Sequence, residues 1–303
     1  MGVLLGVLTA VSWGSSDFVA RFATHKIGAL RTSLYMQMAG FVLLSMFLPW
    51  MGGWGHLLDG SGWQPWAWSA LAGILNGVST LSLYRSFEIG KMAVVAPLSA
   101  SYPALTVALS VLTGEHLNRA RFLGIACVVA GAALVAAGEK PHEAPSSESS
   151  DAQRNLVRLA RSKQTRGGVG WALCSSIGFG FLFWLLGTSI IPSVGYAATV
   201  WMIRLTSSIL TAGVILLLRQ PISLRIAGRI PLWLAGMGVL DTGAFVMSNY
   251  GMRIEQISVV SVLSSLYGAV TVGLAAIFLR ERISRWQSLG IAAIFFGIFL
   301  ISR

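Results

Sequence analysis

Charged residues make up only 11% of this 303-residue sequence, whereas hydrophobic residues make up 55%. With so few charges, and with a mean hydropathy of +0.72, the chain cannot cover a soluble globule with polar surface. The two cysteines, Cys127 and Cys174, both fall within apolar stretches, which argues against a disulfide framework or a thiolate metal site. Zinc-binding spacings, phosphate-binding loops and nucleophile elbows are also absent, so we expect neither an enzyme nor a bound cofactor or metal.

Acidic residues are few, with 11 Asp and Glu against 22 Lys and Arg, and the formal net charge is +11. The basic residues cluster in short segments between apolar stretches, where Lys and Arg set the orientation of membrane helices. We therefore expect the lipid bilayer, and no nucleic acid, as a partner. Most of the basic residues follow the odd-numbered stretches, which predicts that those segments face the cytoplasm and that both termini lie outside.

Long apolar stretches fill most of the chain, and each can cross the roughly 30 Å hydrocarbon core of a bilayer as a helix. They cover residues 3–23, 32–50, 66–87, 92–113, 120–138, 168–187, 196–218, 231–251, 257–279 and 286–302. The predicted fold class is all-α, a polytopic membrane protein with ten transmembrane helices.

The two halves of the sequence repeat each other at an offset of 166 residues. Matching positions include Gly77/Gly243, Tyr84/Tyr250, Ser99/Ser265, Glu115/Glu281 and the run Leu123-Gly124-Ile125-Ala126 against Leu289-Gly290-Ile291-Ala292. With five helices per copy, the second copy enters the membrane from the opposite side, an inverted repeat of the kind on which alternating access is commonly built. We predict two five-helix domains, 1–138 and 168–303, joined by a polar linker at 139–167.

Short sequence elements recur at corresponding places in both halves. The first stretch contains Ser12-Trp13-Gly14, and a Glu precedes a Gly by nine residues at Glu115 and Gly124 and again at Glu281 and Gly290. In these elements the chain resembles the drug/metabolite transporter (DMT) superfamily and its EamA-type ten-helix branch, over nearly its whole length. The resemblance implies a central cavity, lined mainly by helices one, three, four, six, eight and nine, that opens alternately to each side. Family members export or exchange small metabolites; many are described with cytoplasmic termini, the reverse of what the loop charges predict here.

Ionisable residues within the predicted spans each cost at least about 2.5–3.5 kcal/mol, so each needs a partner or a role. Asp241 lies at the middle of the eighth span and Arg204 lies at a similar depth in the seventh, which predicts an ion pair. This pair is either structural or opens to hold the ammonium and carboxylate of a zwitterion. Asp17 precedes Arg21 by four residues, which predicts either a salt bridge along the first helix or a carboxylate in the cavity wall.

Further polar and aromatic residues in these helices complete the candidate site. Asn76 is informative because an amide in apolar surroundings must form a hydrogen bond. The predicted substrate-binding residues are Asp241, Arg204, Asn76, Trp13, Asp17, Ser99, Tyr102, Trp184, Asn249 and Ser265, with Tyr84, Tyr250 and Tyr267 as further wall aromatics.

Other features of the spans predict helix shape and packing. Pro97 and Pro103 predict a kink or hinge in the fourth helix, and since the ninth has Leu263 and Ala269 at the matching positions, we expect the two halves to bend unequally. A charged pair four residues apart predicts an ion pair at a helix end in each half, at Glu115/Arg119 and at Glu281/Arg285. Small residues at every fourth position, Gly2, Gly6, Ala10 and Gly14, predict close helix packing.

Together these features predict a secondary transporter of a bacterial-type inner membrane that works by alternating access. The expected cargo is a small amphipathic metabolite, most plausibly an amino acid, with protons as a candidate coupling ion. A neutral sugar or a lipophilic cation is the alternative cargo, because a fold indicates the transport mechanism better than it indicates the substrate. A channel is the rival class and would need a continuous polar stripe. The sequence indicates no oligomeric state.

Overall fold

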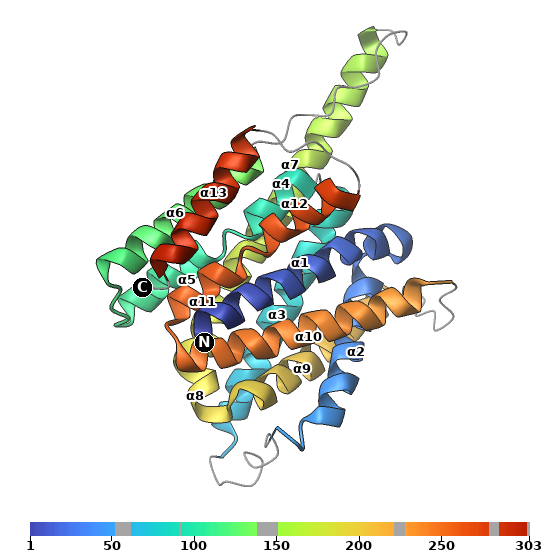
Figure 1. Cartoon of the computed structure of the whole chain (residues 1–303). Helices are drawn as coiled ribbons and strands as arrows, with labels where there is room; N and C mark the ends of the chain where they lie inside the picture. The colour runs from blue at the N-terminus through green and yellow to red at the C-terminus, as the bar shows by residue number, and fades with distance from the viewer. Residues whose placement is uncertain (52–61, 91, 138–150, 221–227, 279–284, 302–303) are drawn as a thin grey trace.

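The computed structural model describes residues 1–51, 62–90, 92–137, 151–220, 228–278 and 285–301, and every regular element in these ranges is a helix (Figure 1). The helices are α1 (Gly2–Ile27), α2 (Ala29–Phe47), α3 (Gln64–Ile89), α4 (Met92–Ser99), α5 (Pro103–Leu112), α6 (Arg119–Ala137), α7 (Asp151–Leu185), the π-helical segment η2 (Leu186–Ile190), α8 (Ile191–Val194), α9 (Tyr196–Leu217), α10 (Ile230–Ile254), α11 (Ile257–Ser264), α12 (Tyr267–Phe278) and α13 (Arg285–Ile301). Each predicted apolar stretch coincides with one helix or with consecutive helices. The all-α class is confirmed for the described ranges.

Within the described ranges, four helical segments are long and apolar enough, by length and composition, to cross a membrane. They are Gly2–Ile27, Gly168–Val194, Tyr196–Leu217 and Ile230–Ile254. Large apolar side chains on the outside of the bundle, such as Leu4, Val42 and Ile209, are more than 40% exposed. A protein in water rarely exposes so much apolar surface, and lipid is the environment that accommodates it.

The fourth predicted span is broken at its middle, because α4 ends at Ser99 and α5 begins at Pro103. The predicted kink is thus confirmed, since Pro103 cannot donate a hydrogen bond to the preceding turn. The ninth span is broken too, between Ser264 and Tyr267, although it has no proline at the matching positions.

Two serines at equivalent positions of the repeat explain the shared break. The hydroxyl of Ser99 donates to the carbonyl of Ala96 at 2.9 Å, and that of Ser265 donates to the carbonyl of Val262 at 2.8 Å. Such bonds compete with the helical ladder and end a helix without proline.

The two broken spans meet at their breaks. The hydroxyl of Tyr102 donates to the carbonyl of Ser261 at 3.1 Å, while the hydroxyl of Tyr267 donates to that of Ser99 at 3.4 Å. All four residues are buried. Each tyrosine therefore reaches from one break to the segment beside the other.

Helix α1 runs through the bundle in contact with α10, α11 and α12. Its predicted small-residue stripe is confirmed as a packing surface. A Cβ atom on Gly14 would lie 2.6 Å from Cβ of Val270 and 2.8 Å from the carbonyl oxygen of Tyr267, and one on Gly6 would lie 2.8 Å from Cβ of Leu263. These contacts hold α1 against the second broken span, with Trp13 and Asp17 at mid-helix.

Three helices lie wholly or partly outside this central arrangement. Helices α6 and α13 pack against each other at one side of the bundle (Figure 1). Helix α7 begins at Asp151, inside the predicted linker 139–167, and its first part projects away from the bundle (Figure 1). The second half of that predicted linker is therefore helical and continuous with the following span.

Candidate functional site

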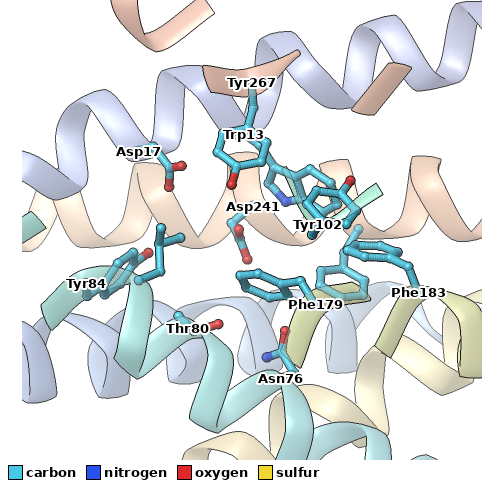
Figure 2. A pocket seen from close by; sticks show the side chains of 12 residues that line it. Trp13, Asp17, Asn76, Thr80, Tyr84, Tyr102, Phe179, Phe183, Asp241 and Tyr267 are labelled. Atoms are coloured by element: carbon cyan, nitrogen blue, oxygen red, sulfur yellow. The ribbon is translucent and has the colours of Figure 1, made fainter. Parts of the chain in front are cut away.

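A pocket at the middle of the bundle brings together side chains from both halves of the chain (Figure 2). It is lined by Trp13 and Asp17 of α1, Asn76, Thr80, Leu83 and Tyr84 of α3, Tyr102 before α5, Phe179 and Phe183 of α7, Asp241 and Phe245 of α10, and Tyr267 of α12. The space between them is about 440 Å³, including the part that opens outward. The lining elements match the helices that the family resemblance implied.

The charged groups of the pocket are two carboxylates. Figure 2 shows the side chains of Asp17 and Asp241 directed into the same space from α1 and α10. Asp17 is 7% exposed, and no hydrogen bond or ion pair joins it to any residue that the structure describes. The predicted salt bridge from Asp17 to Arg21 is therefore wrong. A buried carboxylate with no partner is costly and needs a ligand, a proton or water to offset its burial.

Asp241 has a partner, and the predicted ion pair with Arg204 is confirmed. Nη2 of Arg204 donates to Oδ2 of Asp241. The Arg204 side chain is 1% exposed, whereas that of Asp241 is 17% exposed. The guanidinium lies behind the carboxylate, outside the pocket lining, so the pocket presents acid without base among its described lining residues.

A second contact holds the other side of the guanidinium. Nη1 of Arg204 donates to Oε1 of Gln37, on α2, at 2.5 Å. The Arg204 guanidinium carbon also lies 5.3 Å from the ring centroid of Phe245, a cation–π distance. Gln37 was not among the sequence candidates, because α2 was not assigned to the cavity.

Aromatic rings form the rest of the pocket wall. Trp13 meets Phe183 and Phe245 edge to face, with ring centroids 5.6 Å apart in both cases. Tyr102 stacks on Phe183 at 5.0 Å, and Phe183 stacks on Phe245 at 5.8 Å. These edge-to-face and stacked arrangements are the favoured ones, so the rings pack against one another as one continuous aromatic wall.

Two neutral polar groups face the same space from α3. Nδ2 of Asn76 donates to the hydroxyl of Ser207 at 3.1 Å, which supplies the partner that a buried amide requires. Thr80 follows one turn later on the same face of α3. Asn76 is therefore anchored through its nitrogen.

Half of the predicted site residues line this pocket: Asp241, Asn76, Trp13, Asp17 and Tyr102. Arg204 and Ser99 touch it indirectly, through Asp241 and Tyr267. Ser265, Trp184 and Asn249 do not line it.

Ser265, Trp184 and Asn249 each make a contact elsewhere in the bundle. Ser265 ends α11, as described above. Nε1 of Trp184 donates to the hydroxyl of Thr113 at 3.2 Å, and Asn249 donates to the carbonyl of Tyr196 at 3.3 Å.

Five lining residues were missed: Thr80, Leu83, Phe179, Phe183 and Phe245. Spacing could have identified two of them. Thr80 and Phe245 each follow a predicted site residue by four positions, on the same helix face.

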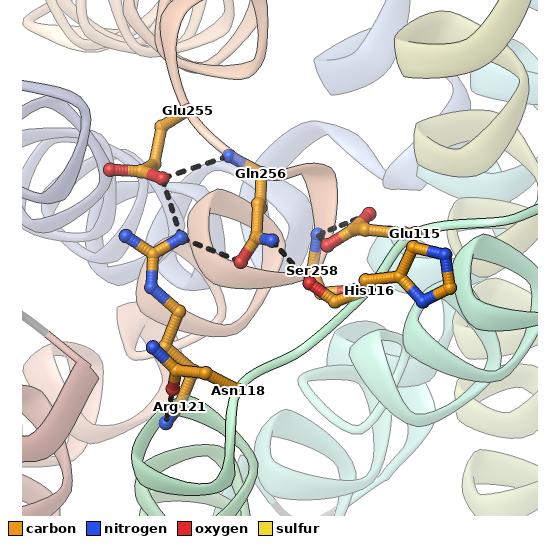
Figure 3. A network of polar contacts seen from close by, with 7 residues as sticks. All are labelled: Glu115, His116, Asn118, Arg121, Glu255, Gln256 and Ser258. Carbon is orange, nitrogen blue, oxygen red and sulfur yellow. Dashed lines mark hydrogen bonds and ion pairs between the residues drawn. The ribbon is translucent and has the colours of Figure 1, made fainter.

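A polar network joins the halves at the end of the bundle where α1 begins (Figure 3). Nη1 of Arg121 donates to Oε1 of Glu255 at 2.9 Å and to Oε1 of Gln256 at 2.6 Å. Nε2 of Gln256 in turn donates to the carbonyl of His116 at 2.7 Å. The segments 115–121 and 255–258 are thereby tied together.

Glu115 belongs to the same network. Its carboxylate accepts the backbone N–H of Ser258 at 3.2 and 3.4 Å, at the start of α11, where a negative charge stabilises the helix dipole. The predicted ion pair between Glu115 and Arg119 is therefore wrong. Its counterpart, Glu281 with Arg285, involves a residue outside the described ranges.

Comparisons with known proteins agree with this geometry. The model of the EamA-like transporter family matches residues 1–137 and again residues 166–303. A protein of a Sinorhizobium species, described as an uncharacterized transporter in the cobO 3′ region, is 39% identical over 74 residues, which are 24% of this chain and 52% of that protein. An uncharacterized protein of Methanocaldococcus jannaschii is 28% identical over 135 residues, which are 44% of this chain and 94% of that protein.

A solved crystal structure of another protein shares the fold. It superposes with a TM-score of 0.73 over 99% of this chain and 95% of that chain, at 17% sequence identity. The family match covers nearly the whole sequence, so the chain belongs to the EamA-like transporter family and is an integral, multi-pass membrane protein with a transport function.

Proposed function

We propose that the chain forms ten membrane spans arranged as two inverted five-helix repeats, 1–138 and 168–303. The equivalent breaks in the fourth and ninth spans support this arrangement, as does the twofold match to one family model. The M. jannaschii relative adds support, because the 135 aligned residues nearly complete that protein yet cover less than half of this chain. One repeat is thus comparable in length to a whole related chain.

We propose further that the protein carries a small amphipathic metabolite with a cationic amine, by alternating access through the central pocket. The observation that carries this proposal is the unpartnered carboxylate of Asp17 in an aromatic pocket. An ammonium group would neutralise Asp17 and meet ring faces that attract cations, while an apolar part of the substrate would lie against Phe179 and Phe183. Export across a bacterial-type inner membrane is the proposed direction and setting.

An amino acid, the cargo expected first from the sequence, is the second candidate here, because Arg204 lies directly behind Asp241. If the pair separates, Arg204 could bind a substrate carboxylate while an aspartate binds the ammonium. A neutral sugar has less support because, apart from its tyrosines, the pocket lining offers a sugar only two neutral polar side chains, Asn76 and Thr80. A channel has less support still, because the wall of aromatic rings interrupts any continuous polar stripe.

Uptake into proteoliposomes tests the proposal. A pool of isotope-labelled amines, amino acids, sugars and organic cations is offered with and without an imposed pH gradient, and the lumen is read by mass spectrometry. We expect amines to enter, and the Asp17→Asn variant to lose this uptake. Glu88, whose side chain is partly exposed near the end of α3 and pairs with Arg85 outside the pocket lining, provides the charge-removing control Glu88→Gln. Uptake of sugars alone would contradict the cationic substrate, and stimulation by the gradient would support proton coupling.

A further inference from the structure

Gln37 touches the transport site only through Arg204. It lies on α2, an element with no residue in the pocket lining, and it is fully buried. Its Oε1 and the carboxylate of Asp241 accept hydrogen bonds from different nitrogens of the same guanidinium. Arg204 is therefore shared between an amide that the pocket does not reach and a carboxylate that lines the pocket.

Polar atoms beside this contact have unused hydrogen-bonding capacity. Nε2 of Gln37, Nε of Arg204 and the hydroxyl of Thr242 are buried without a partner. A Cβ atom placed on Gly40 would collide with the Thr242 hydroxyl and would lie 3.3 Å from Nε of Arg204, so these two polar atoms lie beside Gly40. A buried polar atom left without a partner is costly, which implies that these atoms form further bonds in another arrangement.

The charge of Arg204 explains why such an arrangement matters. The guanidinium is a cation tethered to the bundle, and it occupies the carboxylate that a substrate ammonium would use at α10. An ammonium that binds Asp241 must weaken the bond from Arg204. The guanidinium then needs other acceptors, because it is 1% exposed and cannot turn to water. Oε1 of Gln37 and the ring of Phe245 are already in contact with it.

We propose that Gln37 is a positioning residue that shares Arg204 with Asp241, and that the strength of its bond to Arg204 sets how readily a cationic substrate displaces the guanidinium from Asp241. This inference rests on the proposed function. When the guanidinium bonds to both acceptors, as in the structure, the pocket has one carboxylate fewer to offer. When it bonds to Gln37 alone, Asp241 is available together with Asp17. Binding of the substrate amine to Asp241 is thus coupled to the loss of the bond between Asp241 and Arg204.

Two substitutions of Gln37 shift the bonding of Arg204 in opposite directions. Gln37→Glu puts a full negative charge at the distal side of Arg204, and charge-assisted bonds are about twice as strong as neutral ones. Asp241 is released, and the affinity for an amine rises by about tenfold. Gln37→Leu removes the oxygen acceptor and leaves the sulfur of Met36 at 4.0 Å, a weak acceptor. Arg204 then depends on Asp241, and the affinity falls by about tenfold.

Binding of tritiated 2-phenylethylamine to the purified full-length protein measures both shifts. The probe carries one ammonium and one aromatic ring, which suit the carboxylates and the ring faces of the pocket. Exposed Gln220, at the end of α9, provides the control, because Gln220→Glu adds the same charge far from the site and is expected to leave the dissociation constant unchanged. In an Asp241→Asn background, the two Gln37 variants are expected to differ by less than about twofold, since the carboxylate that shares Arg204 is removed.

The outcomes separate this inference from the function on which it rests. If wild-type protein binds the probe but both Gln37 variants shift affinity the same way, or stay within twofold of wild type, the positioning role is refuted and the cationic substrate stands. If Gln37→Leu does not yield folded protein, Gln37→Glu decides alone, because weaker or unchanged binding by it refutes the role. If wild type binds no amine, the proposed substrate class fails and the inference fails with it.

Discussion

The buried pair of Arg204 and Asp241 predicts an unequal cost for removing its two members. Breaking a buried ion pair by deleting one partner costs about 3–5 kcal/mol when the remaining charge has no solvent. Arg204 is 1% exposed, so Asp241→Leu leaves a guanidinium with Gln37 as its one strong acceptor and should cost this full amount. Asp241 is 17% exposed and faces the pocket, so Arg204→Met leaves a carboxylate that water can reach. We expect the second variant to lose about 1–2 kcal/mol.

The double variant should recover most of the loss, because it leaves no unpaired charge at this place. The free energy of unfolding is measured by titrating the protein in mixed detergent micelles with dodecyl sulfate and following circular dichroism. The predicted order of stability is wild type, then the double variant and Arg204→Met, with Asp241→Leu least stable. A larger loss for Arg204→Met than for Asp241→Leu would refute the reasoning from exposure, and additive losses in the double variant would refute the pair itself.

Three further predictions concern other contacts. Asp17→Asn should abolish amine uptake yet raise the free energy of unfolding by about 1 kcal/mol, because it removes an unpaired buried charge; lower stability in the same titration would imply a hidden partner. Gly14→Ala should cost about 1–3 kcal/mol, since its new Cβ would lie 2.6 Å from Cβ of Val270, whereas Gly243→Ala, with nothing within 4 Å, should cost nothing; equal losses would argue against close packing of α1. Arg121→Met removes the bonds to Glu255 and Gln256, so it should speed the labelling by a thiol reagent of a cysteine placed at buried Ser258. Cys127 and Cys174 are first replaced by serine. An unchanged labelling rate would show that the network does not close this end of the bundle.

The positions of the helices could be predicted from the sequence because each membrane-spanning helix is a long run of apolar residues. The Arg204 and Asp241 pair could be predicted as well, since charges within such runs are rare and two at one depth need each other. Trp13 and Asn76 were found because they lie in helices that the family uses as cavity wall. In each case a local signal carried enough information.

Which side of a helix faces the pocket could not be predicted so well. A helix that is apolar all round has no polar face to mark its exterior, so Trp184 and Asn249 were as plausible as Phe183 and Phe245. Gln37 was missed because its partner lies 167 residues away in the sequence. Glu115 was given a neighbour four residues on, whereas its partner is the start of α11, 143 residues away. Contacts between the halves depend on how the repeats pack, which no local spacing encodes.

The reciprocal contacts of Tyr102 and Tyr267 have a mechanical consequence. Each hydroxyl belongs to one broken span and is held by the segment that precedes the break in the other. A force that straightens or bends either span therefore pulls on its counterpart at the centre of the bundle, without passing through any loop. Bending at one break is therefore coupled to bending at the other, to the extent that these two hydrogen bonds hold.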